Sequence, residues 1–170
     1  MSAEPGLGPD AVVREALAFS SAFQSLLMAT ADGDGHPHVS YAVHVTDTSG
    51  AFYVYISGLA MHTRNLANRP VASIMFIEDE GQAANPFARK RLTIDCGAEL
   101  IPRHTPSWEE VLARFAERHG GIVGVLKGLP DFQLFRLVPT AGVYVRGFGQ
   151  AYTLAAEQFR GAGSGDEEQG

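Results

Sequence analysis

The period of hydrophobic and polar positions changes along the chain and separates an early helix from a series of strands. Val13, Leu17 and Ala18 follow Asp10 at helical spacing, which predicts a helix over residues 11–20 with Asp10 as its N-cap. Apolar and β-branched runs interrupted by "DGDG" and "DTSG" predict a three-stranded meander over residues 24–57. The continuous apolar run at 71–78 predicts a buried strand.

The second half of the chain contains further strands and the clearest helical pattern. "RLTIDCGAELI" predicts a strand over 91–101, with Gly97 as a candidate bulge. Ser107 and Glu110 form a possible capping box for a helix over 107–119, which Gly120 would end. "FQLFRLVP" and "AGVYVRGFGQAYTL" return to strand period. Six or seven strands joined mainly by tight turns predict a mainly β fold of the α+β kind, a mostly antiparallel barrel with peripheral helices.

Composition places this barrel in one domain. The chain has 170 residues, so we expect a single domain over residues 11–155, a flexible N-terminus at 1–10 and a flexible acidic, Gly-rich tail at 156–170. The net charge of −6 argues against general binding to nucleic acid or to an anionic membrane. No signal peptide or membrane-spanning run is apparent, so we expect a cytoplasmic protein. The single cysteine, Cys96, is expected to be a small buried hydrophobic residue.

A basic segment stands out in this acidic chain. Five of the 13 basic residues lie between positions 64 and 91, namely Arg64, Arg69, Arg89, Lys90 and Arg91. The stretch "HTRNLAN" has helical character, so Ser57, Thr63 and nearby amides could lie at a helix N-terminus that binds phosphate or carboxylate. The alternative is that the arginines pair with acidic residues elsewhere or are simply solvated.

Other candidate residues carry weaker signals. His36, His38 and His44 share strand parity, but no metal-binding motif accompanies them, so we expect turn-proximal histidines and no metal site. The aromatic residues of "AFYVYIS" and "VYVRGFGQAY" are expected in the core or at an interface, although they could also wall a flat conjugated ligand. No nucleophile or nucleotide-binding motif is present, so a cofactor is expected to carry any chemistry and no catalytic residue is assigned.

Several stretches together resemble a known family. They are "DGHPHVSYAVHV", "FYVYISGLAMHTRNLANRPVASIMF", "ARKRLTIDCGAELI", "DFQLFRL" and "GVYVRGFGQAY". Their order resembles the FMN-binding split β-barrel of pyridoxamine-phosphate-oxidase-like proteins, and more closely the heme-utilization branch of HugZ/HutZ-like proteins. The resemblance runs from about residue 20 to residue 153 and implies a homodimer with two cofactor sites at the subunit interface, open to a small-molecule substrate.

The resemblance also implies which residues would contact FMN. Besides Arg64 of the basic segment, they are Ser40, Tyr41, Ser57, His62, Thr63, Asn65, Lys90 and Arg91. Pyridoxamine-phosphate oxidases carry an arginine at the position of Ser40 and an Arg-Lys pair where Met61 and His62 stand. These departures weaken the implied phosphate clamp and argue against pyridoxamine-phosphate oxidase activity.

Three functions follow from the resemblance. The first is an FMN-binding oxidoreductase of unknown substrate. The second is a heme-binding or heme-degrading protein, in which Arg64, Arg89 or Arg91 would pair with propionates. Heme degraders of this branch use a late histidine as axial ligand, whereas the last histidine here is His119. The third is a non-catalytic binding dimer with a degenerate site. The role of Asp131, in the matching "DF" element, is left open, and a turn or cap residue is the simplest interpretation.

Overall fold

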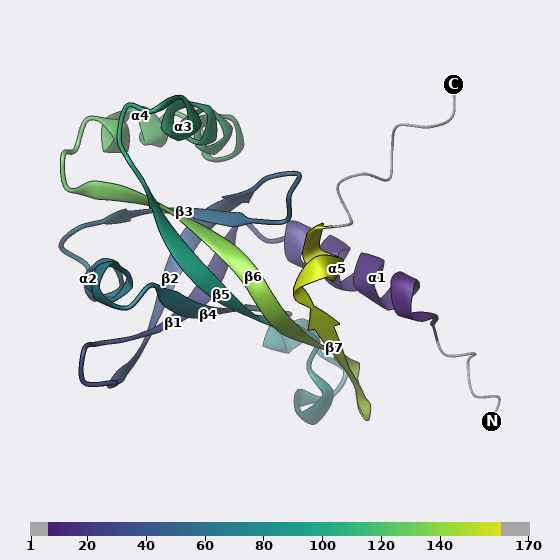
Figure 1. The fold of residues 1–170 in the computed structure, drawn as a ribbon. Coiled ribbons are helices and arrows are strands. Elements are labelled where there is room, and N and C mark those ends of the chain that lie inside the picture. The colour runs from purple at the N-terminus through teal and green to yellow at the C-terminus, as the bar shows by residue number, and fades with distance from the viewer. Residues whose placement is uncertain (1–6, 161–170) are drawn as a thin grey trace, which may run out of the picture.

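The computed structural model describes residues 7–160 and contains seven strands and five α-helices within them (Figure 1). The strands are β1 (Ser25–Ala31), β2 (Pro37–Thr46), β3 (Phe52–Ser57), β4 (Val71–Ile77), β5 (Arg91–Ile101), β6 (Phe132–Gly147) and β7 (Gln150–Ala155). The helices are α1 (Pro9–Ser21), α2 (Met61–Asn68), α3 (Pro106–His119), α4 (Ile122–Lys127) and α5 (Ala156–Arg160), with 3-10 turns η1 (Glu80–Gln82) and η2 (Pro86–Ala88).

The strands form one antiparallel sheet that closes on itself. Their order is β3-β2-β1-β4-β5-β6-β7, and an additional pairing of β3 with β6 closes six of them into a barrel. The length of β6 makes this closure possible, because residues 132–137 pair with β3 while residues 141–147 pair with β7. The predicted mainly β split barrel with antiparallel strands and peripheral helices is confirmed.

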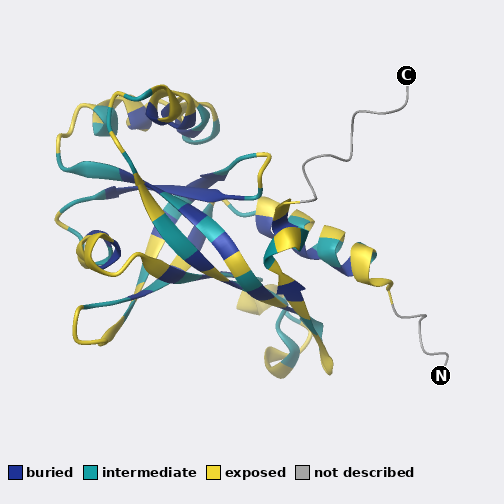
Figure 2. Cartoon of the chain, in the orientation of Figure 1, coloured by how far each residue is buried: buried dark blue, intermediate teal, exposed yellow. Residues whose placement is uncertain are grey.

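The core has two parts, one inside the barrel and one outside it. Inward-facing residues such as Met28, Ile74, Phe76 and Ile94 fill the barrel interior. The second part lies between the outer surface of β3 and helices α3 and α4, around Trp108. Strand β3 is therefore buried on both faces, which explains why "FYVYI" is continuously apolar (Figure 2).

Helices α1 and α5 lie beside each other against the barrel (Figure 1). The α5 helix anchors there through Phe159, which is almost fully buried. A Cβ atom added to Gly142 of β6 would lie only 2.7 Å from the Phe159 ring, so the ring occupies space that only glycine leaves open.

The N-terminal caps of α1 and α3 differ from those predicted from the sequence. Helix α1 begins at Pro9 with Gly8 as its N-cap, so Asp10 lies in the first turn and is not the cap. Helix α3 begins at Pro106, because the Thr105 side chain accepts a 3.3 Å hydrogen bond from the Trp108 amide. The capping box predicted at Ser107 was thus two residues late.

Two further elements differ from the sequence prediction. The irregularity in β5 lies between Asp95 and Cys96 and not at Gly97. Residues 156–160, predicted as the start of the tail, form helix α5, while the predicted tail at 161–170 and the first six residues lie outside the described part. No helix within residues 7–160 has the length and apolarity needed to cross a membrane.

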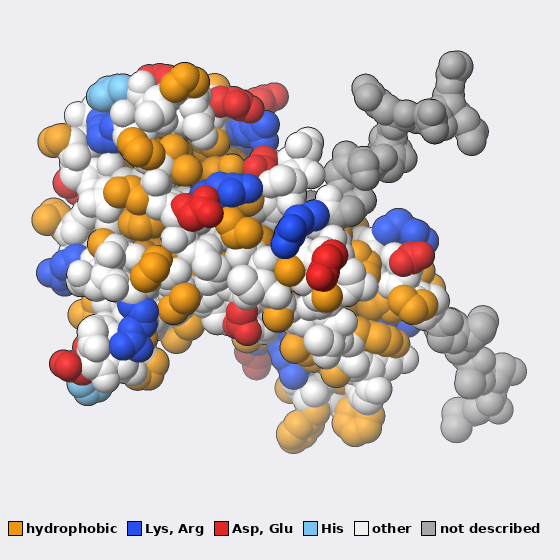
Figure 3. Space-filling view, in the orientation of Figure 1, with side chains coloured by type: hydrophobic (Ala, Val, Ile, Leu, Met, Phe, Trp, Pro, Cys, Tyr) orange, Lys and Arg blue, Asp and Glu red, His pale blue; other side chains and the backbone are white. Residues whose placement is uncertain are grey.

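Two segments extend beyond the barrel and carry exposed aromatic rings. Phe87, in η2, is 88% exposed and Phe148, at the tip of the β6–β7 hairpin, is 81% exposed. Hydrophobic side chains protrude at this end of the molecule, at the bottom of Figure 3. Charged side chains of both signs are scattered over the same view.

Candidate functional site

The junction between β3 and α2 is held by a segment distant in the sequence. Ser57 Oγ donates a 2.8 Å hydrogen bond to Asp131 Oδ2, and the Gly58 amide donates a 2.8 Å bond to the Asp131 carbonyl. A Cβ atom on residue 58 would lie 2.7 Å from that carbonyl oxygen, so this close approach requires glycine. Asp131, whose role the sequence left open, fastens the end of β3 to the start of β6.

Helix α2 continues from this junction, and two of its polar side chains form hydrogen bonds within the protein. Thr63 Oγ1 donates to the Ser57 carbonyl at 2.5 Å, and Asn65 Nδ2 donates to Thr30 Oγ1 at 3.0 Å. Thr63 and Asn65 are buried, whereas Arg64 is exposed. The side chains of Ser57, Thr63 and Asn65, predicted to contact FMN, are thus already engaged within the protein.

Two histidines, His38 of β2 and His62 of α2, lie where α2 faces the barrel. His38 is paired with Thr30 across β1 and β2, so both side chains point to the same face of the sheet. Asn65 contacts Thr30 from α2, and His62 precedes Asn65 by one helical turn. Partial burial, together with the charge of His38, lowers the pKa of His62. The geometry therefore brings His38 and His62 together and favours a neutral His62.

Ser40 and Tyr41, the predicted flavin contacts on β2, point to opposite faces of the sheet. Ser40 Oγ donates a 3.2 Å hydrogen bond to the Met28 carbonyl and is half-buried, on the same face as His38. Tyr41 is 62% exposed on the outside of the barrel. Within one chain, the two side chains therefore cannot contact one ligand from the same side.

The basic segment divides into two groups at opposite ends of β4. Helix α2 leads into Val71, which pairs with Gly97, whereas Arg91 pairs with Ile77 at the far end. A strand of this length separates its ends by about 20 Å. Lys90 lies 3.9 Å from Glu15, and Arg91 donates to the Arg89 carbonyl at 2.9 Å. Lys90 and Arg91 thus do not face α2 within one chain.

The remaining histidines on or near β2 do not converge. His36 lies in the exposed β1–β2 turn, where its amide and that of Asp34 both donate to Asp32 Oδ1 at 2.9 Å. The side chains of Asp32, Asp34 and His36 come close enough to hold a metal ion, but these turn contacts account for their proximity. His44 is fully buried, and its Nε2 lies 3.0 Å from the Phe23 carbonyl.

A row of outward-facing side chains crosses five strands of the barrel. In register order it contains Tyr41, Leu27, Met75, Thr93 and Val143, which we call the outer row. Tyr41, Leu27 and Val143 are exposed at 62%, 39% and 44%. A shallow, mainly apolar groove of about 430 Å³ runs beside it, between Ala29, Val71 and Thr140. Sequence periodicity missed this surface, because an apolar run such as 71–78 is equally typical of a fully buried strand.

The fold and these positions match a known family. The family model described as pyridoxamine 5'-phosphate oxidase matches residues 12–146, most of the chain. The chain belongs to the pyridoxamine 5'-phosphate oxidase family. This membership confirms the resemblance seen in the segments around β2, α2 and β5.

Similarity to individual proteins places the chain in the heme-utilization branch of the pyridoxamine 5'-phosphate oxidase family. It is 47% identical over 134 residues to the heme oxygenase HutZ of Vibrio cholerae, covering 79% of this chain and 76% of that protein. A solved structure of HutZ from Vibrio cholerae, described as a heme storage protein, superimposes with a TM-score of 0.70 and 45% identity, covering 74% of this chain and 88% of that chain. Campylobacter jejuni ChuZ superimposes with a TM-score of 0.81 and 30% identity, covering 96% and 68%.

Proposed function

We propose that this protein binds heme and that the pair formed by His38 and His62 supplies the iron ligand. The observation that carries the proposal is the 47% identity to a protein named heme oxygenase HutZ over 79% of the chain. This kinship favours heme over the FMN-dependent oxidoreductase that the family resemblance alone implies.

The residues around α2 fit the needs of a heme group. Iron coordinates neutral imidazole, and partial burial of His62 lowers its pKa and favours that form. The exposed apolar residues Leu59 and Met61 lie next to His62 at the start of α2 and could cover part of a porphyrin. Bound heme would supply a redox-active iron, while this chain would supply the ligand and exclude water from one side.

Helix α2 carries no basic side chain on the side of His62 that could pair with the heme propionates. Arg64 is two residues after His62, so the two side chains leave the helix on nearly opposite sides. Lys90 and Arg91 lie at the other end of β4. A second subunit would solve this problem if it brought its own Lys90 and Arg91 towards α2.

We therefore also propose a homodimer that buries the outer row. Packing of two outer rows would remove the exposed Tyr41, Leu27 and Val143 side chains from water. A two-fold axis between the sheets, running across β4, would place the Val71 end of one strand over the Ile77 end of the other. Such an arrangement would bring α2 of each subunit close to the basic residues of its partner, at two symmetric sites.

Titration of the purified protein with hemin tests the heme proposal. We expect hemin binding to produce a saturable Soret band. Replacement of both His38 and His62 by alanine should weaken the hemin affinity at least tenfold. His104→Asn is the matched control, because His104 is exposed and has a left-handed backbone (φ 62°) that asparagine tolerates. Hemin affinity no higher than that of an unrelated acidic protein would refute heme binding. An unchanged double variant would refute the ligand assignment.

FMN is the second candidate, because the matching family model is that of pyridoxamine 5'-phosphate oxidase. The internal hydrogen bonds of Ser57, Thr63 and Asn65 leave fewer groups for its phosphate. Quenching of FMN fluorescence on addition of the protein would support a flavin-dependent oxidoreductase. The third candidate, a non-catalytic binding dimer, predicts that neither hemin nor FMN changes the melting temperature.

A further inference from the structure

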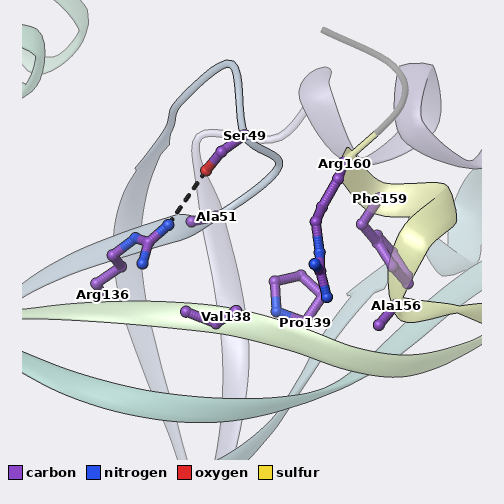
Figure 4. Close-up of a pocket in the computed structure, with 8 residues that line it drawn as sticks. All are labelled: Ser49, Ala51, Arg136, Val138, Pro139, Ala156, Phe159 and Arg160. Atoms are coloured by element: carbon purple, nitrogen blue, oxygen red, sulfur yellow. Dashed lines mark hydrogen bonds between the residues drawn. The ribbon is translucent and has the colours of Figure 1, made fainter.

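A cavity between β6 and α5 contains two arginine side chains and lies apart from the β3–α2 junction. Its volume is about 290 Å³. Arg136 of β6 and Arg160 at the end of α5 flank an apolar lining that includes Val138, Pro139 and Phe159 (Figure 4). Among the described residues, no acidic side chain lines this cavity.

Arg136 is held in place by two side chains outside the apolar lining. Its Nη1 donates to Glu99 Oε2 at 3.2 Å, and its Nη2 donates to Ser49 Oγ at 3.3 Å. The single hydroxyl proton of Ser49 is directed to Asp47 Oδ1 at 2.6 Å, so Ser49 acts as an acceptor for Arg136. A guanidinium group has five N–H donors, and Arg136 therefore keeps donors for a ligand.

Arg160 has no such partners in the part of the chain that is described. Within residues 7–160, no hydrogen bond or ion pair engages its guanidinium group, although its side chain extends alongside Pro139 (Figure 4). An arginine that lines a cavity without an acidic partner favours an anionic ligand, because guanidinium binds carboxylate with paired hydrogen bonds.

We propose that this cavity binds a small organic dianion of the dicarboxylate class, with one carboxylate at Arg136 and the other at Arg160. Val138 and Pro139 lie between the two arginines in Figure 4 and would contact the short apolar body of the ligand. Because Val138 and Pro139 separate the two arginines, the cavity fits a ligand with two separate acidic groups better than one phosphate. A single phosphate would need both guanidinium groups to converge on one point. The site uses none of the residues proposed for heme and is independent of that function.

Calorimetric titration of the full chain with succinate tests this proposal, with butyrate and inorganic phosphate as comparison ligands. We expect saturable succinate binding and at least tenfold weaker binding of butyrate, which has the same number of carbons but one carboxylate. Arg136→Gln and Arg160→Gln should each weaken succinate binding at least tenfold. Arg14→Gln is the matched control, because Arg14 is an exposed arginine on α1 outside the cavity. Glu99→Gln should tighten binding severalfold, since it removes the carboxylate that competes for Arg136.

The acidic residues Asp166, Glu167 and Glu168 follow Arg160 in the sequence and carry the same chemical group as the proposed ligand. A second protein with these three residues changed to asparagine and glutamine is therefore titrated in parallel. Succinate binding by the wild type or by the tail variant supports the site, provided that Arg136→Gln and Arg160→Gln each abolish it. Absence of binding in both proteins, or full binding by the folded Arg136→Gln and Arg160→Gln variants, would overturn it. Phosphate that binds as tightly as succinate would overturn the dicarboxylate assignment.

Discussion

The hydroxyl group of Ser57 donates a 2.8 Å hydrogen bond to Oδ2 of Asp131, 74 positions later in the chain. This bond ties the end of β3 to the segment that precedes β6. The first turn of α2, which carries His62, follows directly from that tie. The position of the proposed heme ligand therefore depends on a contact between segments that are distant in the sequence.

Replacement of Asp131 by alanine should loosen this junction. The half-buried Ser57 hydroxyl would lose its acceptor, so we expect the free energy of unfolding to fall by about 1–2 kcal/mol. Asp131→Asn, which retains an acceptor oxygen, should lose less. Urea unfolding measures both values, and equal losses in the two variants would show that the hydrogen bond is not the cause.

His44 should make the protein less stable in mild acid. Burial, and next the charge of Arg118, lower the pKa of His44 from its ordinary value of 6.5 to about 4 in the folded protein. Above pH 6.5 both folded and unfolded states hold His44 neutral, so its contribution to stability is complete. Between pH 6.5 and pH 4 only the unfolded state gains the proton, and stability falls by up to about 3 kcal/mol.

Unfolding experiments from pH 7.5 to pH 4 would measure this loss. In His44→Gln, which cannot bind the proton, we expect lower stability at pH 7.5 but a flatter dependence on pH. Other titrating groups act on both proteins alike, so the difference isolates His44. Parallel pH profiles for the two proteins would contradict the assignment.

The packing of α5 against the barrel should be destabilised by one added methyl group at Gly142. In Gly142→Ala the new Cβ would lie 2.7 Å from Phe159 Cζ and 3.2 Å from the Thr93 carbonyl oxygen. We expect a loss of about 1–3 kcal/mol in thermal or urea unfolding, since the ring must move. Gly124→Ala in α4 is the control, because its Cβ meets nothing within 4 Å and alanine favours helix. A cost that is equal at both positions would argue against the steric explanation.

The proposed dimer should dissociate when the outer row becomes charged. Tyr41→Lys places a cation at the β2 end of the proposed interface, where it would have to be desolvated, so we expect at least a tenfold weaker association. Light scattering after size exclusion measures the molecular mass of wild type and variant. Thr48→Lys, an exposed position beyond the end of β2, is the control. A monomeric wild type, or a variant that associates as tightly, would refute the interface.

Local sequence signals determined most elements of this protein and its family. Strand period and turn residues predicted the strands that became β1 to β5, and the segments around β2, α2 and β5 carried the resemblance that the family match confirmed. These signals are local because turns and amphipathic periods depend on residues close together in the chain. The short helices α4 and α5 were missed, since their five or six residues depend on packing against the barrel for stability.

Only the tertiary structure decided how the candidate residues combine. The basic residues at 64–69 and 89–91 looked like one cluster, but β4 runs between them and keeps them about 20 Å apart within one chain. No local pattern pairs His38 with His62, and the contact of Asn65 with Thr30 brings them together. Arg136 and Arg160 line one cavity only because Phe159 packs α5 over Gly142. Such contacts between distant segments follow from barrel closure, which no local pattern encodes.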